Sequence, residues 1–447
     1  MSDDEAYYYV WSQYPAWSYF DHPPFVAWVL HFATYFISNV LYSFRITALI
    51  AHVTAFAGLI VLCKKINNNS VHWLYLSAFL VSPMYFILGI AVIPDTLLLP
   101  ITIWYWVIFI TFLEKNNPKY ILLLGCMGGL AILTKYSGIF LPVATFIYLL
   151  SEPKYRKYIV SPYFYAGACL IALGAIPAFA WNITNDFSGF SYHVNRLSVV
   201  KPTSIVLLVF GQIVYFGPIV FMLGFSLYIC FKRKLEPKQK MILIQAGIPL
   251  FMTIVLLLFA KDAKPHWLAP FWFPFFAFIE QRKILSQSQN FFFRYQKTLF
   301  IGVSMTMLLL AQIHIQSGLL HSLFTTLNDN HKTHDPTADL LGWNVFVDEF
   351  SPMYKKSLHT HENKNMLILS HQWQLCSQLF LWLSKKDMQN FLVCAEKKIS
   401  QFSFLETHSI KRLTINSQYY FITDSIWNRN PDTLIDSAKC KPINQIP

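Results

Sequence analysis

The sequence predicts an α-helical polytopic membrane protein that ends in a small α/β extramembrane domain. Of its 447 residues, 55% are hydrophobic and only 13% are charged, whereas a soluble domain carries about 25% charged residues. Apolar stretches recur from about residue 43 to residue 318, and the composition then turns polar. A lipid bilayer therefore replaces water as the solvent for most of the chain.

The apolar stretches give the expected membrane helices, which form a transmembrane domain over 43–318. Several stretches are shorter than the ~20 residues that a spanning helix needs, so their length alone does not fix the number of crossings. Residues 1–42 are rich in aromatic residues and lack such a run, and we expect an outer-face loop with amphipathic helices lying on the membrane. The apolar stretches are 43–62, 71–92, 96–113, 120–134, 136–150, 159–181, 203–231, 240–260, 266–279 and 298–318.

The basic residues orient these helices. They are concentrated in one alternating set of loops, which the positive-inside rule places in the cytoplasm. The opposite ends then collect the acids and histidines on the extracytoplasmic side. The formal net charge of +12 is explained by this orientation, so we expect membrane lipids and no nucleic acid as partners. The cytoplasmic set is Lys64, Lys65, Lys115, Lys119, Lys154, Arg156, Lys157, Lys232, Arg233, Lys234, Lys238, Lys240, Arg282, Lys283, Arg294 and Lys297.

The polar segment 319–447 contains a second pattern. The runs at 365–370 and 419–424 are strand-like, and 371–386 between them is typical of an amphipathic helix. We therefore expect a small soluble α/β domain over 319–447, on the extracytoplasmic side. Its three cysteines, Cys376, Cys394 and Cys440, allow a disulfide, but the sequence does not indicate a pairing.

Two acidic motifs are candidates for chemistry. Asp4 and Glu5 lie in "DDEAYYYVW", beside the residues expected at the membrane surface. A carboxylate near hydrocarbon is costly, so such acids are functional candidates, although a solvated terminus also explains them. Asp95 lies in "IPDTLLLP", between two apolar stretches, where it is either a functional acid or a helix N-cap.

The basic candidates also have two interpretations each. Lys135, in "ILTKYSGIF", either extends to the membrane interface or binds a phosphate as a point charge. His266, in "KPHWLAP", is either an interfacial anchor or a metal ligand. Arg196 lies in another loop on the same side. No single motif is specific, but together they place carboxylates and cations on one face of the membrane.

Taken in order, "DEAYYYVWSQ", "YFDHPP", "PDTLLL", "LTKYSG", "PAFAWNITNDF", "KPHWLAP" and "DPTADLLGW" resemble a known family. It is the bacterial family-39 glycosyltransferases of the dolichyl-phosphate-mannose protein mannosyltransferase type, related to the lipid A aminoarabinose transferases. The resemblance implies a GT-C fold in the bacterial inner membrane. It also implies an inverting transfer of a sugar from a polyprenyl-phosphate donor to a lipid A, glycan or protein acceptor.

The resemblance assigns roles to several residues. It implies that Asp4, with Glu5 beside it, and Asp95 are catalytic acids. It implies donor-phosphate contacts and a possible divalent cation (Mg, Mn or Zn) at other positions. We expect no nucleotide cofactor, since a lipid-linked donor needs no nucleotide-sugar cradle. The phosphate-binding candidates are Lys135, Arg196 and His22, and the metal-ligand candidates are Asp21 and His266.

The opening of the chain departs from the family pattern. Relatives carry a transmembrane helix before the "DEAYY" motif, whereas only Met1 to Asp3 precede Asp4 here. We expect either a native start upstream or a non-catalytic relative that lacks the first helix. A transporter or flippase of a lipid-linked sugar is the alternative from another class. Such proteins often show internal repeats, and the sequence shows none.

Overall fold

The computed structural model divides the chain into two compact units. The membrane unit is Ala16–Gln312, and the composite unit joins Met1–Pro15 to Ile313–Pro447. Each unit is described by itself. The structure describes residues 1–66, 69, 71, 76, 79–197, 202–216, 220, 237–260, 264–272, 291–317, 319, 340, 343–360, 366–394, 400–405, 408 and 418–422.

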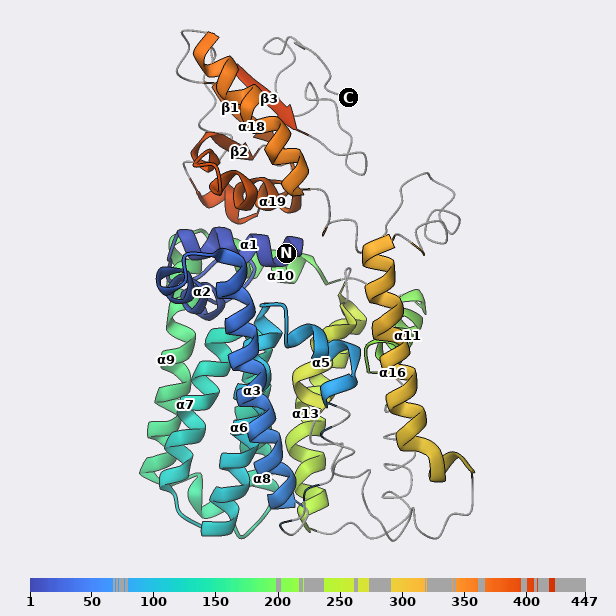
Figure 1. Ribbon diagram of the computed structural model, residues 1–447. Coiled ribbons are helices and arrows are strands. Elements are labelled where there is room, and N and C mark those ends of the chain that lie inside the picture. The colour runs from blue at the N-terminus through green and yellow to red at the C-terminus, as the bar shows by residue number, and fades with distance from the viewer. Residues whose placement is uncertain are drawn as a thin grey trace. The chain divides into compact units, whose positions relative to one another are not determined.

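The membrane unit is built from helices (Figure 1). Among the described residues, four helical segments are long and apolar enough to cross a bilayer: α3, α6, α9 and the segment Met241–Phe259 of α13. The chain is thus a multi-pass membrane protein. The helices are α2 (Phe25–Phe36), α3 (Val40–Ile66), α5 (Pro83–Leu88), α6 (Pro94–Lys115), α7 (Lys119–Thr134), α8 (Phe140–Ser151), α9 (Pro162–Thr184), α10 (Ser188–Asn195), α11 (Pro202–Phe216), α13 (Pro237–Phe259), α14 (Ala269–Trp272) and α16 (Phe291–Ser317), which reaches past Gln312.

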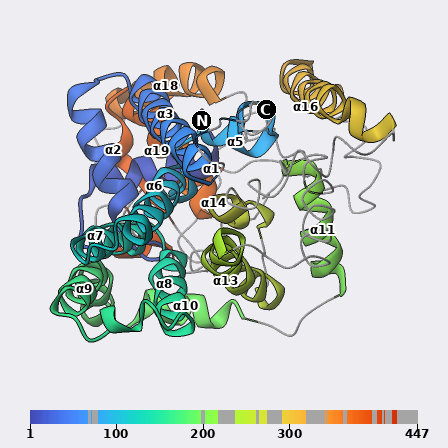
Figure 2. The same ribbon diagram turned by 90° about the horizontal axis from the view of Figure 1, so that it is seen from below.

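Close helix packing in this unit depends on small residues. Helices α6 and α7 form a hairpin, α3 packs on α6, and α7 packs on α9 (Figure 2). A Cβ atom at Gly125 of α7 would lie only 2.6 Å from the carbonyl oxygen of Gly167 on α9. Glycine at both positions lets the two backbones approach, which is how helices associate in lipid, where no hydrophobic effect drives them together.

The two ends of the bundle differ in charge, as the loop pattern predicts. At one end, Lys65 in the last turn of α3 donates to Glu114 of α6 at 2.6 Å, and Tyr158 donates to the Asn116 carbonyl oxygen at 2.8 Å. These contacts connect the segments that carry the basic residues. The opposite end carries the N-terminus of α6 and the C-termini of α7 and α9, together with the candidate site residues.

Several predicted stretches match helices closely, and one does not. The stretches 96–113, 120–134 and 136–150 correspond to α6, α7 and the segment that ends with α8. The stretch 71–92 is not a single spanning helix. It holds the six-residue helix α5, which starts at Pro83, because proline ends the preceding helix and fits the first turn of the next. Parts of 203–231, 266–279 and 335–343 lie outside the described residues.

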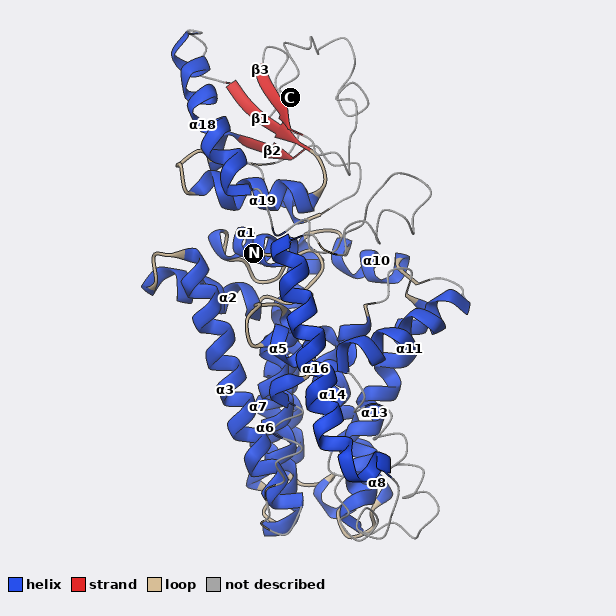
Figure 3. Ribbon diagram, turned by 45° about the vertical axis from the view of Figure 1, so that its right-hand side comes forward, coloured by secondary structure: helices blue, strands red, loops and turns tan. Residues whose placement is uncertain are grey.

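The C-terminal part of the composite unit has the predicted strand–helix–strand order (Figure 3). Three parallel strands form a sheet in the order β2-β1-β3. Helix α19 connects β1 to β2, and Cys376 of α19 forms a disulfide with Cys394 of β2. The elements are α18 (Trp343–Thr360), β1 (Met366–Ser370), α19 (Trp373–Ser384), β2 (Leu392–Cys394) and β3 (Gln418–Ile422).

Helix α1 (Asp3–Gln13) belongs to the composite unit and packs on α19. The expected boundaries, 1–42 and 319–447, therefore differ from the division by contacts. The first 15 residues group with the C-terminal segment, and the rest of 1–42 groups with the membrane helices. The reason is long-range packing between residues more than 370 positions apart in sequence, which no local pattern shows.

Candidate active site

A buried ion pair is the centre of the candidate site in the membrane unit. The Lys135 ammonium donates to both carboxylate oxygens of Asp95, at 2.8 Å to Oδ1 and 2.9 Å to Oδ2. Both residues are buried. A buried charge is stable only when it is paired and hydrogen-bonded. The ammonium has three N–H donors, so it retains the capacity to bind a further anion.

The α6–α7 hairpin explains why these two residues meet. Asp95 lies in the first turn of α6, and Lys135 directly follows the last residue of α7. Antiparallel helices joined by a short turn bring these two ends together. The helix-cap interpretation of Asp95 is wrong, because the N-cap residue is Ile93. The carboxylate instead holds the lysine, and the positive end of the α6 dipole also favours its charge.

The Trp267 ring contacts two of the predicted phosphate-binding residues. The Lys135 ammonium lies 5.3 Å from its centroid, and the Arg196 guanidinium lies 5.7 Å from it. A β-bridge between Leu197 and Ala260 joins the segment after α10 to the end of α13, close in sequence to Trp267. Cation–π contacts of this kind hold cations at a partly desolvated surface. Two cations thus lie beside one aromatic ring.

Three histidines surround this centre. His266 Nε2 lies 3.8 Å from Asp95 Oδ2. Burial lowers the pKa of His266 to about 4, with Asp95 raising it and Lys135 and Lys264 lowering it further. Burial likewise lowers the pKa of His193 to about 4. For His22, burial and then the charge of Lys135 hold the pKa well below its usual value. All three are neutral imidazoles at pH 7.

The DHPP segment is tied to this site through its backbone. His193 Nε2 lies 3.0 Å from the carbonyl oxygen of Asp21, and the His193 ring contacts Tyr136, which follows Lys135. His22 lies close enough to Lys135 and Arg196 for their positive charges to lower its pKa. The structure therefore brings the predicted residues Lys135, Arg196, His22 and His266 together around Asp95.

The predicted metal site receives no such grouping. In the described part of the chain, no three or more His, Cys, Asp or Glu side chains are arranged to hold a metal ion. The nearest acidic contact of His266 is to Asp95 rather than to Asp21. The metal expected at Asp21 and His266 therefore stays a prediction.

The predicted acids Asp4 and Glu5 lie on α1 of the composite unit. Ser2 caps this helix: its hydroxyl accepts from the Glu5 amide at 3.3 Å, and the Glu5 carboxylate accepts from the Ser2 amide at 3.1 Å. Glu5 is buried within this capping box, whereas Asp4 is exposed. Of these two acids, Asp4 is therefore the more accessible.

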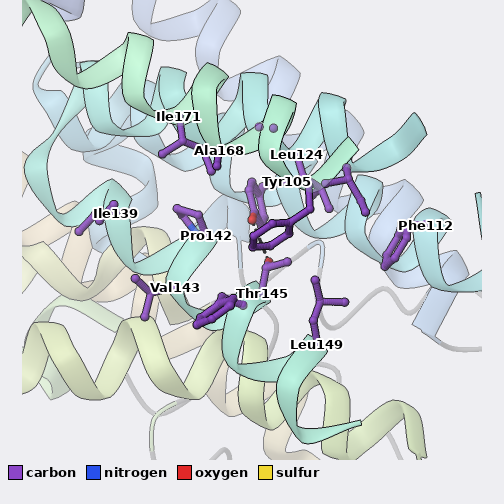
Figure 4. Close-up of a pocket in the computed structure, with 15 residues that line it drawn as sticks. Tyr105, Phe112, Leu124, Ile139, Pro142, Val143, Thr145, Leu149, Ala168 and Ile171 are labelled. Carbon is purple, nitrogen blue, oxygen red and sulfur yellow. Dashed lines mark hydrogen bonds between the residues drawn. The ribbon is translucent and has the colours of Figure 1, made fainter. Parts of the chain in front are cut away.

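A cavity of about 260 Å³ lies among α6, α7, α8 and α9. Figure 4 shows its lining, which is apolar apart from Tyr105 and Thr145, whose hydroxyls lie 2.8 Å apart. Ile139, which lines the cavity, ends the 3₁₀ turn η1 (Tyr136–Ile139), and this turn starts directly after Lys135. The cavity therefore begins about one helical turn along the chain from the buried ion pair.

Sequence reasoning did not find the role of Trp267 or the pairing of Asp95 with Lys135. The signal for the pair was present: the two residues are nearly equidistant from the turn between α6 and α7. The signal for Trp267 was its place next to His266, where it was interpreted only as part of an anchor.

Comparisons with known proteins agree with this fold. Residues 21–181 match the family described as dolichyl-phosphate-mannose-protein mannosyltransferase. The lipid A galacturonosyltransferase RgtD of Rhizobium johnstonii is 24% identical over 271 residues, which are 59% of this chain and 56% of that protein. The chain thus spans little more than half the length of this curated relative.

Two solved structures share the fold. The crystal structure of ArnT from Cupriavidus metallidurans bound to undecaprenyl phosphate has a TM-score of 0.54 at 17% identity, covering 73% of this chain and 62% of that one. The apo structure of the same protein has a TM-score of 0.52 at 17% identity, covering 73% and 61%. The fold is therefore of GT-C type. The resemblance to the family-39 glycosyltransferases, related to enzymes that modify lipid A, is confirmed.

Proposed function

We propose that this chain transfers a sugar from a polyprenyl-phosphate donor to a lipid A-type acceptor, at the extracytoplasmic face of the bacterial inner membrane. The observation that carries the proposal is the cationic centre of Lys135 and Arg196 around Trp267. A lipid phosphate is the anion that such a centre fits at the end of a membrane helix bundle. The family match and the two ArnT structures support the same donor class.

The positive-inside pattern supports the proposed side of the membrane, since the site lies at the end opposite the basic loops. The disulfide between Cys376 and Cys394 supports it independently, because disulfides persist in oxidising compartments such as the periplasm. The apolar cavity beside Ile139 is placed to take part of the polyprenyl chain, once the phosphate binds Lys135.

The reaction needs one base and a stabilised leaving group. A carboxylate base takes the proton of the acceptor hydroxyl, which is the role that the "DEAYY" motif implies for Asp4, and the hydroxyl oxygen attacks the anomeric carbon of the donor sugar. The bond from that carbon to the phosphate oxygen breaks, and the phosphate leaves with the electron pair. Lys135 and Arg196 stabilise the negative charge that develops. Direct displacement inverts the anomeric configuration. Asp95, which was expected to be a second catalytic acid, acts here by holding Lys135.

Donor binding tests this proposal most simply. The purified chain in nanodiscs is titrated with undecaprenyl phosphate, and Lys135→Met is compared with Lys119→Met, an exposed lysine at the other end of α7. We expect Lys135→Met to weaken binding about tenfold or more and Lys119→Met to leave it unchanged. Equal affinities in the two variants would contradict the proposed phosphate site.

Sugar transfer is then assayed with undecaprenyl-phosphate-linked galacturonic acid, mannose and aminoarabinose, and with lipid A as acceptor. Turnover with one of these donors, giving an inverted linkage, is the expected result. Donor binding without any transfer would favour the transporter or non-catalytic interpretation.

A further inference from the structure

Helix α1 is attached to the C-terminal segment at the residue next to Asp4. The side-chain amide of Gln378 on α19 donates to Asp3 Oδ1 at 2.8 Å and to the Met1 carbonyl oxygen at 3.1 Å. Gln378 is fully buried. One amide group therefore fixes both the backbone and a carboxylate at the acidic end of the helix.

Aromatic packing fixes the middle of α1. The Tyr7 ring lies 4.8 Å from the Trp373 ring of α19 and 4.9 Å from the Trp11 ring, measured between centroids. The Tyr7 hydroxyl accepts the backbone N–H of Gln401 at 2.8 Å. Its burial thus includes a polar partner, as buried tyrosines require. This contact determines how α1 is rotated about its own axis.

A hydrogen-bonded chain fixes the C-terminal end of α1. Tyr14 directly follows the helix, and its hydroxyl lies 2.7 Å from His408 Nε2. His408 Nδ1 lies 2.8 Å from the Leu392 carbonyl oxygen, so Nδ1 carries the proton and donates to it. In the neutral ring, Nε2 then accepts from the Tyr14 hydroxyl. These two hydrogen bonds thus link the end of α1 to β2 of the parallel sheet.

These contacts matter because α1 does not position itself. It has 11 residues, and an isolated helix of this length is only marginally stable in water. Its first turn also carries Asp3, Asp4 and Glu5, whose like charges repel one another. The orientation of Asp4 therefore depends on the scaffold beneath it.

We propose that α19 and the sheet position the acid-bearing helix α1 for catalysis, and that Gln378 is the positioning residue for its acidic end. This inference rests on the proposed function, because it assigns Asp4 a role in transfer. It gives the C-terminal α/β segment a function: the segment holds the catalytic acid. Gln378 acts through Asp3 and Met1 and has no role in binding the donor.

The test uses the full chain in nanodiscs and two independent readouts. Hydrogen–deuterium exchange of the peptide 1–15 reports whether α1 is docked, and kcat and KM are measured with the donor of highest turnover. The variants are Gln378→Ala and the near-isosteric Gln378→Glu. Gln374→Ala is the matched control, since the side chain of this half-buried glutamine of the same helix makes no hydrogen bond within the described residues.

We expect faster exchange of peptide 1–15 in Gln378→Ala, with kcat lowered about 10- to 100-fold and donor KM unchanged. Gln378→Glu places a carboxylate against Asp3, and one of the two then has a raised pKa. Its kcat is therefore low at pH 8 and recovers near pH 6, when a shared proton restores the hydrogen bond. A purely structural loss would not recover on acidification.

Three results would overturn the inference. Exchange of peptide 1–15 that is equal in Gln378→Ala and Gln374→Ala would show that Gln378 does not hold α1. Faster exchange with unchanged kcat would show that docking does not serve catalysis. A wild-type chain that transfers no sugar, but in which docking depends on Gln378, would reject the proposed function and the catalytic role of docking, while the Gln378 contact itself would stand.

Discussion

Asp4 of α1 and Asp95 of α6 have opposite environments. Asp95 is buried, and both its oxygens accept from Lys135. Asp4 is exposed on the first turn of a short helix. The Asp95 carboxylate is enclosed by protein and bound to a cation, whereas the Asp4 side chain is accessible from solvent. The difference distinguishes two acids that the sequence motifs alone do not: Asp95 holds a cation, and Asp4 is the base in the function proposed above.

The largest effect is expected from breaking the buried pair. Lys135→Met leaves the Asp95 carboxylate buried without its partner, which costs about 3–5 kcal/mol of stability. The double variant Asp95→Asn with Lys135→Met removes both charges and regains most of this loss. Thermal unfolding in detergent, with Lys119→Met as the control, measures both. A Lys135→Met protein as stable as the wild type would show that the pair does not hold the bundle end.

A smaller effect is expected in the composite unit. Replacing Cys376 and Cys394 by serine opens the link between α19 and β2 and should cost about 2–4 kcal/mol. Because α19 carries α1, exchange of peptide 1–15 should also rise. Cys126→Ser, at an exposed free cysteine of the membrane unit, should change neither. Unchanged exchange of peptide 1–15 after loss of the disulfide would show that the docking of α1 does not depend on this link.

The smallest effect is expected in how the stability of the membrane unit depends on pH. His193 and His266 have pKa values lowered to about 4, whereas an unfolded histidine titrates near 6.5. The unfolded state therefore binds more protons between these values, and stability falls as the pH decreases from about 6.5 to 4. Each histidine should contribute on the order of 1–2 kcal/mol of loss by pH 5.

Unfolding of the membrane unit at pH 8 and at pH 5, in the wild type and in His266→Gln, checks this expectation. The variant should lose part of the pH dependence. An identical dependence in both proteins would mean that His266 does not contribute to it.

Local pattern was sufficient for much of the fold. The apolar runs predicted α3, α6, α7, α9 and α13, and the strand-like runs at 365–370 and 419–424 predicted β1 and β3 with α19 between them. The run at 71–92 is the exception, because of a proline. Its apolar residues continue on both sides of Pro83, but a new helix, α5, begins at Pro83. Hydropathy does not register such a break, because it sums side chains and ignores the missing backbone N–H.

The candidate site was predictable in its residues but not in its pairings. Charge and position selected Asp95, Lys135, Arg196 and His266, because polar groups at the end of membrane helices are costly unless they have a use. Their arrangement depends on which helix ends meet. The hairpin geometry implies the pairing of Asp95 with Lys135, but the contact between Asp3 and Gln378 joins residues 375 positions apart. Only the folded chain shows that contact.

Turnover of Asp4→Asn and Asp95→Asn, measured side by side with the best donor, tests the central claim most directly. We expect Asp4→Asn to lower turnover about 10²- to 10⁴-fold with unchanged affinity for undecaprenyl phosphate. Asp95→Asn should instead weaken donor binding and stability, because Lys135 loses its partner. Asp186→Asn is the control, since this acid is exposed and its positive φ of 52° suits asparagine equally. Near-normal turnover of Asp4→Asn would contradict the assignment of Asp4 as the base.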